Sequence, residues 1–232
     1  MFQNLINELE FFQDKNKAKI LQRFFKTGVG EYGEGDIFLG ITVPILRKLA
    51  KKYKDLSVDD LEKLLQSNIH EQRFLALCII RLNYEEGKTE KKYFFELSLK
   101  NISSINNWDL VDTFVPYVIG DFLKKNGNIS LLYEYVKSQN LWIKRIAIMS
   151  TFAFIKANSF DDTIKICELL LADKHDLIQK ACGWMLREVG KRDEKILINF
   201  LEKYHKIMPR TMLRYSLEKL DKEKKDYFMG RR

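Results

Sequence analysis

The sequence is poor in proline, cysteine and histidine, with only three of each among its 232 residues. An odd number of cysteines, all of them within apolar helical stretches, does not suit a disulfide-stapled secreted domain. We therefore expect buried free thiols in the reducing interior of a cell. The three cysteines are Cys78, Cys167 and Cys182.

The three histidines lie far apart in the chain, and none has a cysteine or a second histidine at the spacing of metal ligands. They are His70, His175 and His205. A zinc deaminase or a metal-dependent nuclease needs such a cluster, so neither class is expected, and no metal or organic cofactor is predicted. His175 stands near a predicted helix start, where a capping or surface role is expected.

Long apolar runs are also missing. No stretch approaches the roughly 20 apolar residues that a membrane-spanning helix needs. Phe11 and Phe12 form too short a run for a signal peptide, and Asp14 and Lys15 follow them directly. The sequence therefore predicts a cytoplasmic protein that does not bind membranes.

The alternation of apolar and polar residues that marks β-strands is essentially absent. Apolar residues recur instead at steps of three and four, as at Leu61, Leu64 and Leu65. Helix starts are indicated at Ser57, at 173–176, and at Thr42 before Pro44. These patterns predict an all-α chain of about a dozen short helices in antiparallel pairs, forming one domain over residues 1–232.

Five helical stretches share a keyed position next to apolar residues, at 73, 112, 145, 180 and 214. The steps between them are 39, 33, 35 and 34 residues, a period typical of a helical-pair solenoid. Four of the keyed residues are basic, namely Arg73, Arg145, Lys180 and Arg214. The fifth is Asp112, and a lone carboxylate in a row of cations is a candidate for chemistry.

The net charge of +8 favours a polyanionic partner such as nucleic acid. Stacked repeats could align the keyed cations so that they follow a phosphate backbone. The same residues could equally bond loop carbonyls and form ion pairs between repeats. Both interpretations are open at the level of the sequence.

Residues 27–40 form the one glycine-rich stretch, with five glycines. A phosphate-binding loop would need a following Lys-Ser or Lys-Thr pair and a preceding strand, and neither is present. We therefore predict that this stretch connects the first helix pair to the repeats.

Around Trp108 the spacing brings candidate groups together. Trp108 and Asp112 are four residues apart and should share one helical face. A purely structural alternative is that Asp109 caps the helix and Asp112 pairs with a neighbouring arginine. Trp184 stands four residues after Lys180, and the adjacent Gly183 would let another surface approach closely.

Four segments together resemble the AlkD-type DNA alkylation repair enzymes, and they occur in that family's order. They are Phe38–Pro44 with Arg47, Trp108–Asp112 with Val115 and Pro116, Leu141–Arg145 with Ala147, and Gly183–Glu188. The resemblance covers about residues 20–215. It implies an all-α solenoid of HEAT-like repeats with a concave basic groove for DNA, acting as a monomer near the nucleoid.

The resemblance also implies roles for individual residues. Asp112 matches the catalytic aspartate, and Trp108 and Trp184 match the tryptophans that hold the deoxyribose of the damaged nucleotide. Arg145 matches the arginine at the phosphate near the lesion, and Phe24 the aromatic residue that faces the lesion. The further residues expected to contact DNA are Arg187, Lys180, Lys144, Arg47 and Thr42.

The activity implied is hydrolysis of the N-glycosidic bond of cationic N3- and N7-alkylpurines in duplex DNA, without flipping the base into a pocket. No histidine lies in the four segments, so no proton donor for a neutral base is expected. Asn107, where well-known members carry tryptophan, and the longer loop 28–36 bear on the range of lesions. The alternatives are a non-catalytic helical-repeat module that binds DNA or protein, and an RNA- or ribosome-associated repeat protein.

Overall fold

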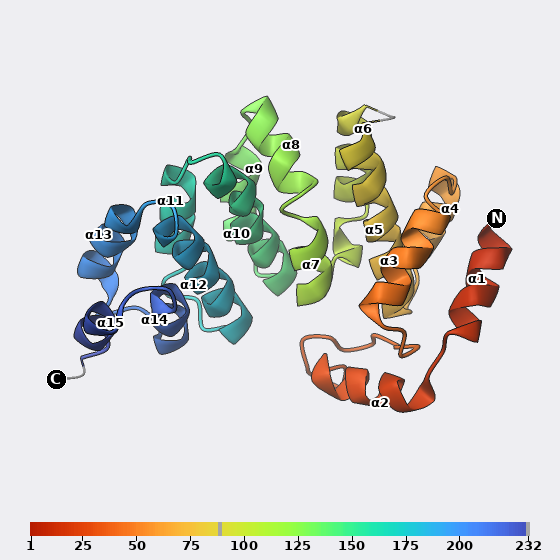
Figure 1. Cartoon of the computed structure of the whole chain (residues 1–232), viewed down its shortest axis with the longest axis horizontal. Coiled ribbons are helices and arrows are strands. Elements are labelled where there is room, and N and C mark those ends of the chain that lie inside the picture. Colours follow the sequence, from red (N-terminus) through yellow and green to blue (C-terminus); the bar gives the residue numbers. More distant parts are fainter. Residues whose placement is uncertain (88–89, 231–232) are drawn as a thin grey trace. The chain divides into compact units, whose positions relative to one another are not determined.

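The computed structural model describes residues 1–87 and 90–230, and within these ranges the regular structure is helical (Figure 1). Fifteen α-helices and one 3-10 helix are present there, and the only β-type pairing in those ranges is an isolated bridge between Ile37 and Ile69. The predicted all-α class is confirmed, with somewhat more helices than the dozen expected.

The chain divides into two compact units, Met1–Phe114 and Val115–Arg232. The division falls inside the segment Trp108–Pro116 that the sequence singled out, so the candidate residues are distributed over both units. A single domain over 1–232 stays a prediction, and each unit is described by itself.

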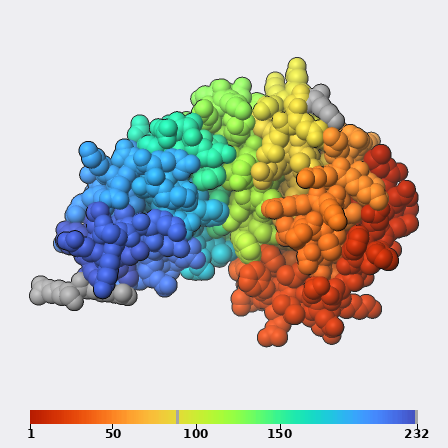
Figure 2. All heavy atoms as spheres, in the orientation of Figure 1, coloured from red at the N-terminus to blue at the C-terminus, as the bar shows by residue number. Residues whose placement is uncertain are grey.

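The first unit contains seven α-helices among its described residues, in which α3 and α4 both pack against α5. The buried apolar side chains of this packing include Leu46, Leu64 and Phe74. In the space-filling view the atoms of α1 to α4 form one continuous red and orange surface (Figure 2). The helices are α1 (Phe2–Phe11), α2 (Lys15–Phe24), α3 (Val43–Lys52), α4 (Val58–Leu65), α5 (His70–Glu86), α6 (Lys91–Lys100) and α7 (Trp108–Phe114), with the 3-10 helix at Ile102–Ser104.

Polar side chains set the helix starts, largely where the sequence indicated. Ser57 accepts a hydrogen bond from the backbone N–H of Asp60 at 3.2 Å, which begins α4. Thr42 precedes α3 with Pro44 in the first turn, although its hydroxyl makes no capping bond. His175 caps α12 through Nδ1, which accepts from the N–H of Leu177 at 3.2 Å. These three predicted helix starts are confirmed.

The second unit is built around α10 and α12, which pack against each other. α10 also packs against α8 and α9, and α12 against α13 and α14. The helices are α8 (Ile119–Asn126), α9 (Ser130–Val136), α10 (Leu141–Lys156), α11 (Asp161–Leu169), α12 (Asp176–Gly190), α13 (Glu194–Tyr204), α14 (Arg210–Leu217) and α15 (Lys222–Phe228).

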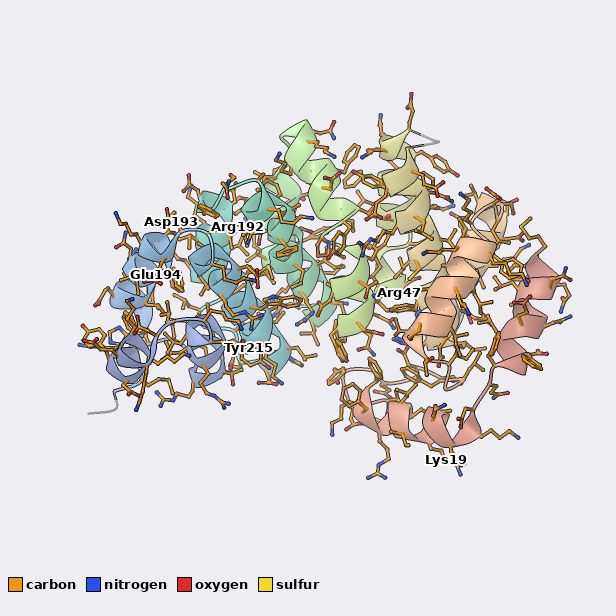
Figure 3. All side chains as sticks on the ribbon, in the orientation of Figure 1. Lys19, Arg47, Arg192, Asp193, Glu194 and Tyr215 are labelled. Atoms are coloured by element: carbon orange, nitrogen blue, oxygen red, sulfur yellow. The ribbon has the colours of Figure 1, made fainter. Side chains whose placement is uncertain are left out.

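Gly183 allows the close packing of α12 on α14. A Cβ atom at this position would lie 2.5 Å from the Met212 carbonyl oxygen and 2.5 Å from the Tyr215 Cβ (Figure 3 labels Tyr215). Real Cβ atoms do not approach backbone that closely, so any larger residue would push the two helices apart. The predicted close approach is confirmed, and the surface that approaches is α14.

The glycine-rich stretch is a connector between α2 and α3, as predicted. Gly40 has φ +84°, and a Cβ there would lie 2.2 Å from the Asp14 carbonyl oxygen. The carboxylate of Glu71 accepts hydrogen bonds from the N–H groups of Leu39, Gly40 and Ile41 at 3.0, 2.8 and 3.2 Å. An internal carboxylate therefore fills the backbone cradle that a phosphate would need.

The three cysteines are buried and free, as the sequence predicted. Burial raises the pKa of the Cys78 thiol to about 12, so this thiol stays protonated and unreactive. Within 1–87 and 90–230, none of the helices is long and apolar enough to cross a membrane.

Candidate active site

The helix α7 presents Trp108 and Asp112 on one half-buried face. Its opposite face buries Leu110, Val111 and Phe114 completely. The fully apolar face fixes the rotation of the helix, so the two candidate residues lie on its other, half-buried side. The shared face that the four-residue spacing predicted is confirmed.

Asn107 begins this helix and is itself fully buried. Its side-chain oxygen accepts from the N–H of Trp108 at 2.9 Å, and its carbonyl accepts from the N–H of Val111 at 3.1 Å. The expected cap, Asp109, accepts instead from the adjacent N–H of Leu110 at 2.9 Å and has a second partner from another helix. The first turn is therefore anchored mainly through Asn107.

Trp108 packs against the end of α2. Its ring stacks on Phe25 with centroids 5.0 Å apart and an interplanar angle of 9°. Phe24 meets it edge to face at 5.9 Å and 77°, while 61% of Phe24 is exposed. Phe24, for which the resemblance implied a position facing the lesion, therefore lies at the surface beside Trp108.

The stack continues from Phe25 into the interior of the first unit. Phe25 stacks on Phe38 at 4.9 Å and 24°, and Phe38 stacks on His70 at 4.4 Å and 21°. Four rings thus run from the half-buried Trp108 to a histidine that is only 2% exposed. The His70 ring also lies 5.1 Å from Phe25, tilted by 41°, so Phe25, Phe38 and His70 form a compact cluster of three rings.

His70 lies between two carboxylates. Its Nδ1 is 3.0 Å from Asp36 Oδ2, and its Nε2 is 2.8 Å from Asp109 Oδ2. Arg73 donates to Asp36 at 2.6 Å and to the Ser67 carbonyl at 2.7 Å. No histidine lies within the four segments themselves, but the fold brings His70 to Asp109 from 39 residues away.

The local backbone brings Asp36 to this histidine. The connector pairs with the start of α5, where Ile37 N–H donates to Asn68 O at 3.0 Å and His70 N–H donates to Ile37 O at 2.8 Å. These bonds place the connector beside the start of α5. The spacing of the residues in the sequence did not predict this pairing.

Electrostatics keep His70 charged. Burial alone would lower its pKa, but the carboxylates of Asp109 and Asp36 outweigh burial and raise the pKa to about 9. Burial likewise opposes the charge on Asp36, yet His70 and Arg73 lower the pKa of its carboxyl below the usual value. The group is therefore an imidazolium between two carboxylates at neutral pH.

A pocket of about 180 Å³ lies beside this network in the first unit. Its walls are largely apolar, and His70, Asp109, Gly40 and Thr42 are among the residues that line it. The pocket is part of the environment of Asp109.

Several of the exposed residues on α2 and α3 are basic. Thr42 and Arg47, at the start and middle of α3, are exposed, as contact with DNA would require (Figure 3 labels Arg47). The helix α2 contains four basic and no acidic residues, and Lys15, Lys19 and Arg23 on it are exposed. The sequence reasoning missed α2, although its run of charge of one sign was visible.

In the second unit Trp184 is half-buried, whereas Trp142 is only 8% exposed and belongs to the core. Lys144 forms an ion pair with Asp173, and Arg187 forms one with Glu218. Lys180 pairs with Asp176 at 2.6 Å on its own helix. All three basic side chains have carboxylate partners, which DNA phosphates would have to replace or share.

Arg145 is 4% exposed and donates a hydrogen bond of 2.5 Å to the Leu177 carbonyl at the start of α12. Arg73 is also 4% exposed and bonds the Ser67 carbonyl. The interpretation that keyed basic residues bond loop carbonyls is confirmed for Arg73, whereas Arg145 bonds a carbonyl in the first turn of α12. In contrast, Lys180 is half-buried and Arg214 is exposed.

The family model for the DNA alkylation repair enzyme matches residues 5–220. This chain belongs to the DNA alkylation repair enzyme family. A solved structure described as a predicted DNA alkylation repair enzyme from Enterococcus faecalis has the same fold, with a TM-score of 0.68 and 17% identity, over 90% of this chain and 97% of that one. No curated protein matches.

Membership of the DNA alkylation repair family implies a DNA substrate. The matched range includes every residue assigned to the site, from Phe24 to Arg187. Among the described residues of this repair protein, no group of three or more His, Cys, Asp or Glu side chains could hold a metal ion.

Proposed function

We propose that this protein is a DNA glycosylase that hydrolyses the N-glycosidic bond of cationic N3- and N7-alkylated purines in duplex DNA. The observation that carries the proposal is the half-buried face of α7, which presents Asp112 and Trp108 together beside Phe24. A carboxylate next to an electron-rich ring suits a reaction in which a sugar becomes cationic.

Water attacks C1′ of the deoxyribose, and the bond from C1′ to the base nitrogen breaks. The bonding electrons leave with the base, which departs neutral because it was already cationic. Asp112 stabilises the oxocarbenium-like sugar and positions the water, whose proton passes to solvent. Trp108 excludes bulk water and offers its ring to the positive charge.

Duplex binding is assigned to basic side chains that are exposed on the first unit and half-buried on the second. On the first unit these are Arg47 and the residues of α2, with Thr42 as a polar contact, and Phe24 lies at the end of that helix. On the second unit we assign Lys144, Lys180 and Arg187 to the DNA backbone and Trp184 to the sugar. The burial of Arg145 supports a role inside the repeats rather than at a phosphate.

The test is incubation of the whole protein with methylated duplex DNA, followed by chromatography of the released bases. Free N3-methyladenine and N7-methylguanine are expected in the soluble fraction. A non-catalytic repeat module would bind the duplex and release nothing, and an RNA-binding repeat protein would prefer RNA in competition. Either result would overturn the proposed activity.

A further inference from the structure

We propose that His70 is a positioning residue for base release. It holds Trp108 in place in two ways, through aromatic contacts to the Trp108 ring and through hydrogen bonds to the residues on either side of Trp108. This inference rests on the proposed function, because Trp108 matters for activity only if the face of α7 carries the chemistry. No part of the four segments that resemble the repair family contains this histidine.

The first set of contacts is aromatic. Trp108 stacks on Phe25 with centroids 5.0 Å apart, and His70 contacts Phe25 both directly at 5.1 Å and through Phe38, at 4.9 and 4.4 Å. A cation on the face of an aromatic ring is attracted to it, so the His70 imidazolium strengthens its stacking contact with Phe38. The position of this cluster in turn determines where the Trp108 ring can lie.

The second set is made of hydrogen bonds. Asp109, which follows Trp108 in the chain, is 2.8 Å from His70 Nε2. Asn107, which precedes Trp108, donates to Asp36 Oδ2 at 3.4 Å, and that same oxygen is 3.0 Å from His70 Nδ1. Both neighbours of Trp108 are thus tied to one imidazole. His70 also contacts the Trp108 ring through Phe25. The backbone of Trp108 and its side chain are therefore both held by His70.

The charge on His70 determines whether both bonds can form at once. A protonated imidazole donates from both nitrogens, whereas a neutral one donates from one nitrogen only and so loses its hydrogen bond to one of the two carboxylates. The charged groups around it are Asp36 on the connector, Asp109 on α7, Arg73 and Glu71 on α5, and Lys17 on α2 beside the pocket. Loss of the proton should release the start of α7.

A fluorescence experiment tests this without any activity. The double variant Trp142→Phe, Trp184→Phe leaves Trp108 as the single tryptophan of the three in the chain. Acrylamide quenching of Trp108 should be low at neutral pH and should rise as the pH passes about 9, where His70 loses its proton. Adding Asp109→Asn should move this transition to lower pH, because one of the two carboxylates that hold the proton is removed.

His70→Gln in the same background should give high quenching at all pH values, since glutamine carries no charge and no ring. His205→Gln is the matched control, because His205 lies in the second unit and bonds the Leu201 carbonyl of its own helix. This control should keep the pH transition of its parent. Quenching that changes neither with pH nor on His70→Gln would overturn the proposal.

Activity gives the second measurement. In the otherwise native chain, His70→Gln should lower kcat for base release about tenfold to a hundredfold, the typical effect of a small misplacement, while the Kd for duplex DNA stays within about twofold. An unchanged kcat would overturn the positioning role. If the native protein releases no base, the proposed function fails, and the quenching of Trp108 still decides whether His70 holds it. If His70→Gln does not fold, the pH transition and its shift in Asp109→Asn decide alone.

Discussion

Asp112 and Asp109 lie on the same short helix, but their surroundings differ. Asp109 is hydrogen-bonded to His70 and to the N–H of Leu110, so it supports the start of α7. Asp112 shares the half-buried face with Trp108. We therefore expect Asp112→Asn to lower kcat by about 10²–10³-fold through the lost charge stabilisation, with duplex affinity unchanged or slightly higher.

The measurement is single-turnover release of N3-methyladenine together with a binding titration. Asp226→Asn, a half-buried carboxylate of α15, is the matched control and should leave both unchanged. Release at the native rate by Asp112→Asn would remove Asp112 from the catalytic role.

The three tryptophans should separate by environment. Trp108 and Trp184 are half-buried, whereas Trp142 is buried in α10. Trp108→Ala and Trp184→Ala should slow excision with a modest loss of stability. Trp142→Ala should cost the ~3–5 kcal/mol typical of a buried aromatic residue while leaving the chemistry of the folded fraction intact. Thermal unfolding and kcat are measured on the same samples. If Trp108 served only the core, Trp108→Ala would lose much stability while the folded fraction kept its native kcat.

Arg145→Ala distinguishes the two interpretations of the keyed cations. Its removal leaves the Leu177 carbonyl without this donor, which should cost about 1–3 kcal/mol of unfolding free energy. The slope of log affinity against log salt should stay the same, since a buried guanidinium contacts no phosphate. A slope reduced in magnitude by about one unit would instead restore Arg145 to the DNA interface.

The stability of the protein should depend on His70. Its pKa is raised from the ordinary 6.5 to about 9, so its stabilising contribution is fully present below about 6.5 and is lost as the pH rises through 9. The unfolding free energy of the native chain should fall by roughly 3 kcal/mol more than that of His70→Gln between these two pH values. Denaturant titrations at both pH values measure this difference, and equal losses in the two proteins would contradict it.

At the scale of elements, α2 joins a basic exposed face to the aromatic contact with Trp108. Only Ala18 is buried along this helix, so replacing its outer charges should not disturb the core. Changing Lys15, Lys19 and Arg23 together to Gln should reduce the magnitude of the salt slope by about two to three units, since each phosphate contact contributes about 0.9.

The matched control for α2 removes the same charge elsewhere. Lys206, Lys219 and Lys222 are exposed in the second unit, and changing all three to Gln alters the net charge equally. A salt slope that fell as much in this control would mean that α2 acts through net charge and not through contact.

At the scale of the whole molecule, the candidate site predicts which class of damaged base is released. Expulsion of a neutral base requires a proton donor. His70 is protonated but only 2% exposed and is held between two carboxylates, so it is a poor donor to a base outside the core. N3-methyladenine and N7-methylguanine should therefore be released, whereas hypoxanthine and ethenoadenine should not. Efficient release of either neutral base would identify a donor, and the first residue to test would be His70.

The sequence alone determined the elements and part of the site. Apolar spacing and capping residues act over three or four positions, so the helices and the start of α4 could be predicted from local chemistry. The shared face of Trp108 and Asp112 also followed from helix geometry. The close approach at Gly183 was expected because a residue without a side chain leaves room for another helix.

Only the tertiary structure decided which distant groups meet. Asp36, His70 and Asp109 come from the connector, α5 and α7, and no periodicity links them. The backbone pairing of Ile37 with the start of α5 and the stack from Trp108 inward bring them together. Burial likewise decided that Arg145 donates to a carbonyl, because a keyed position specifies the face of a helix but not the depth of its side chain.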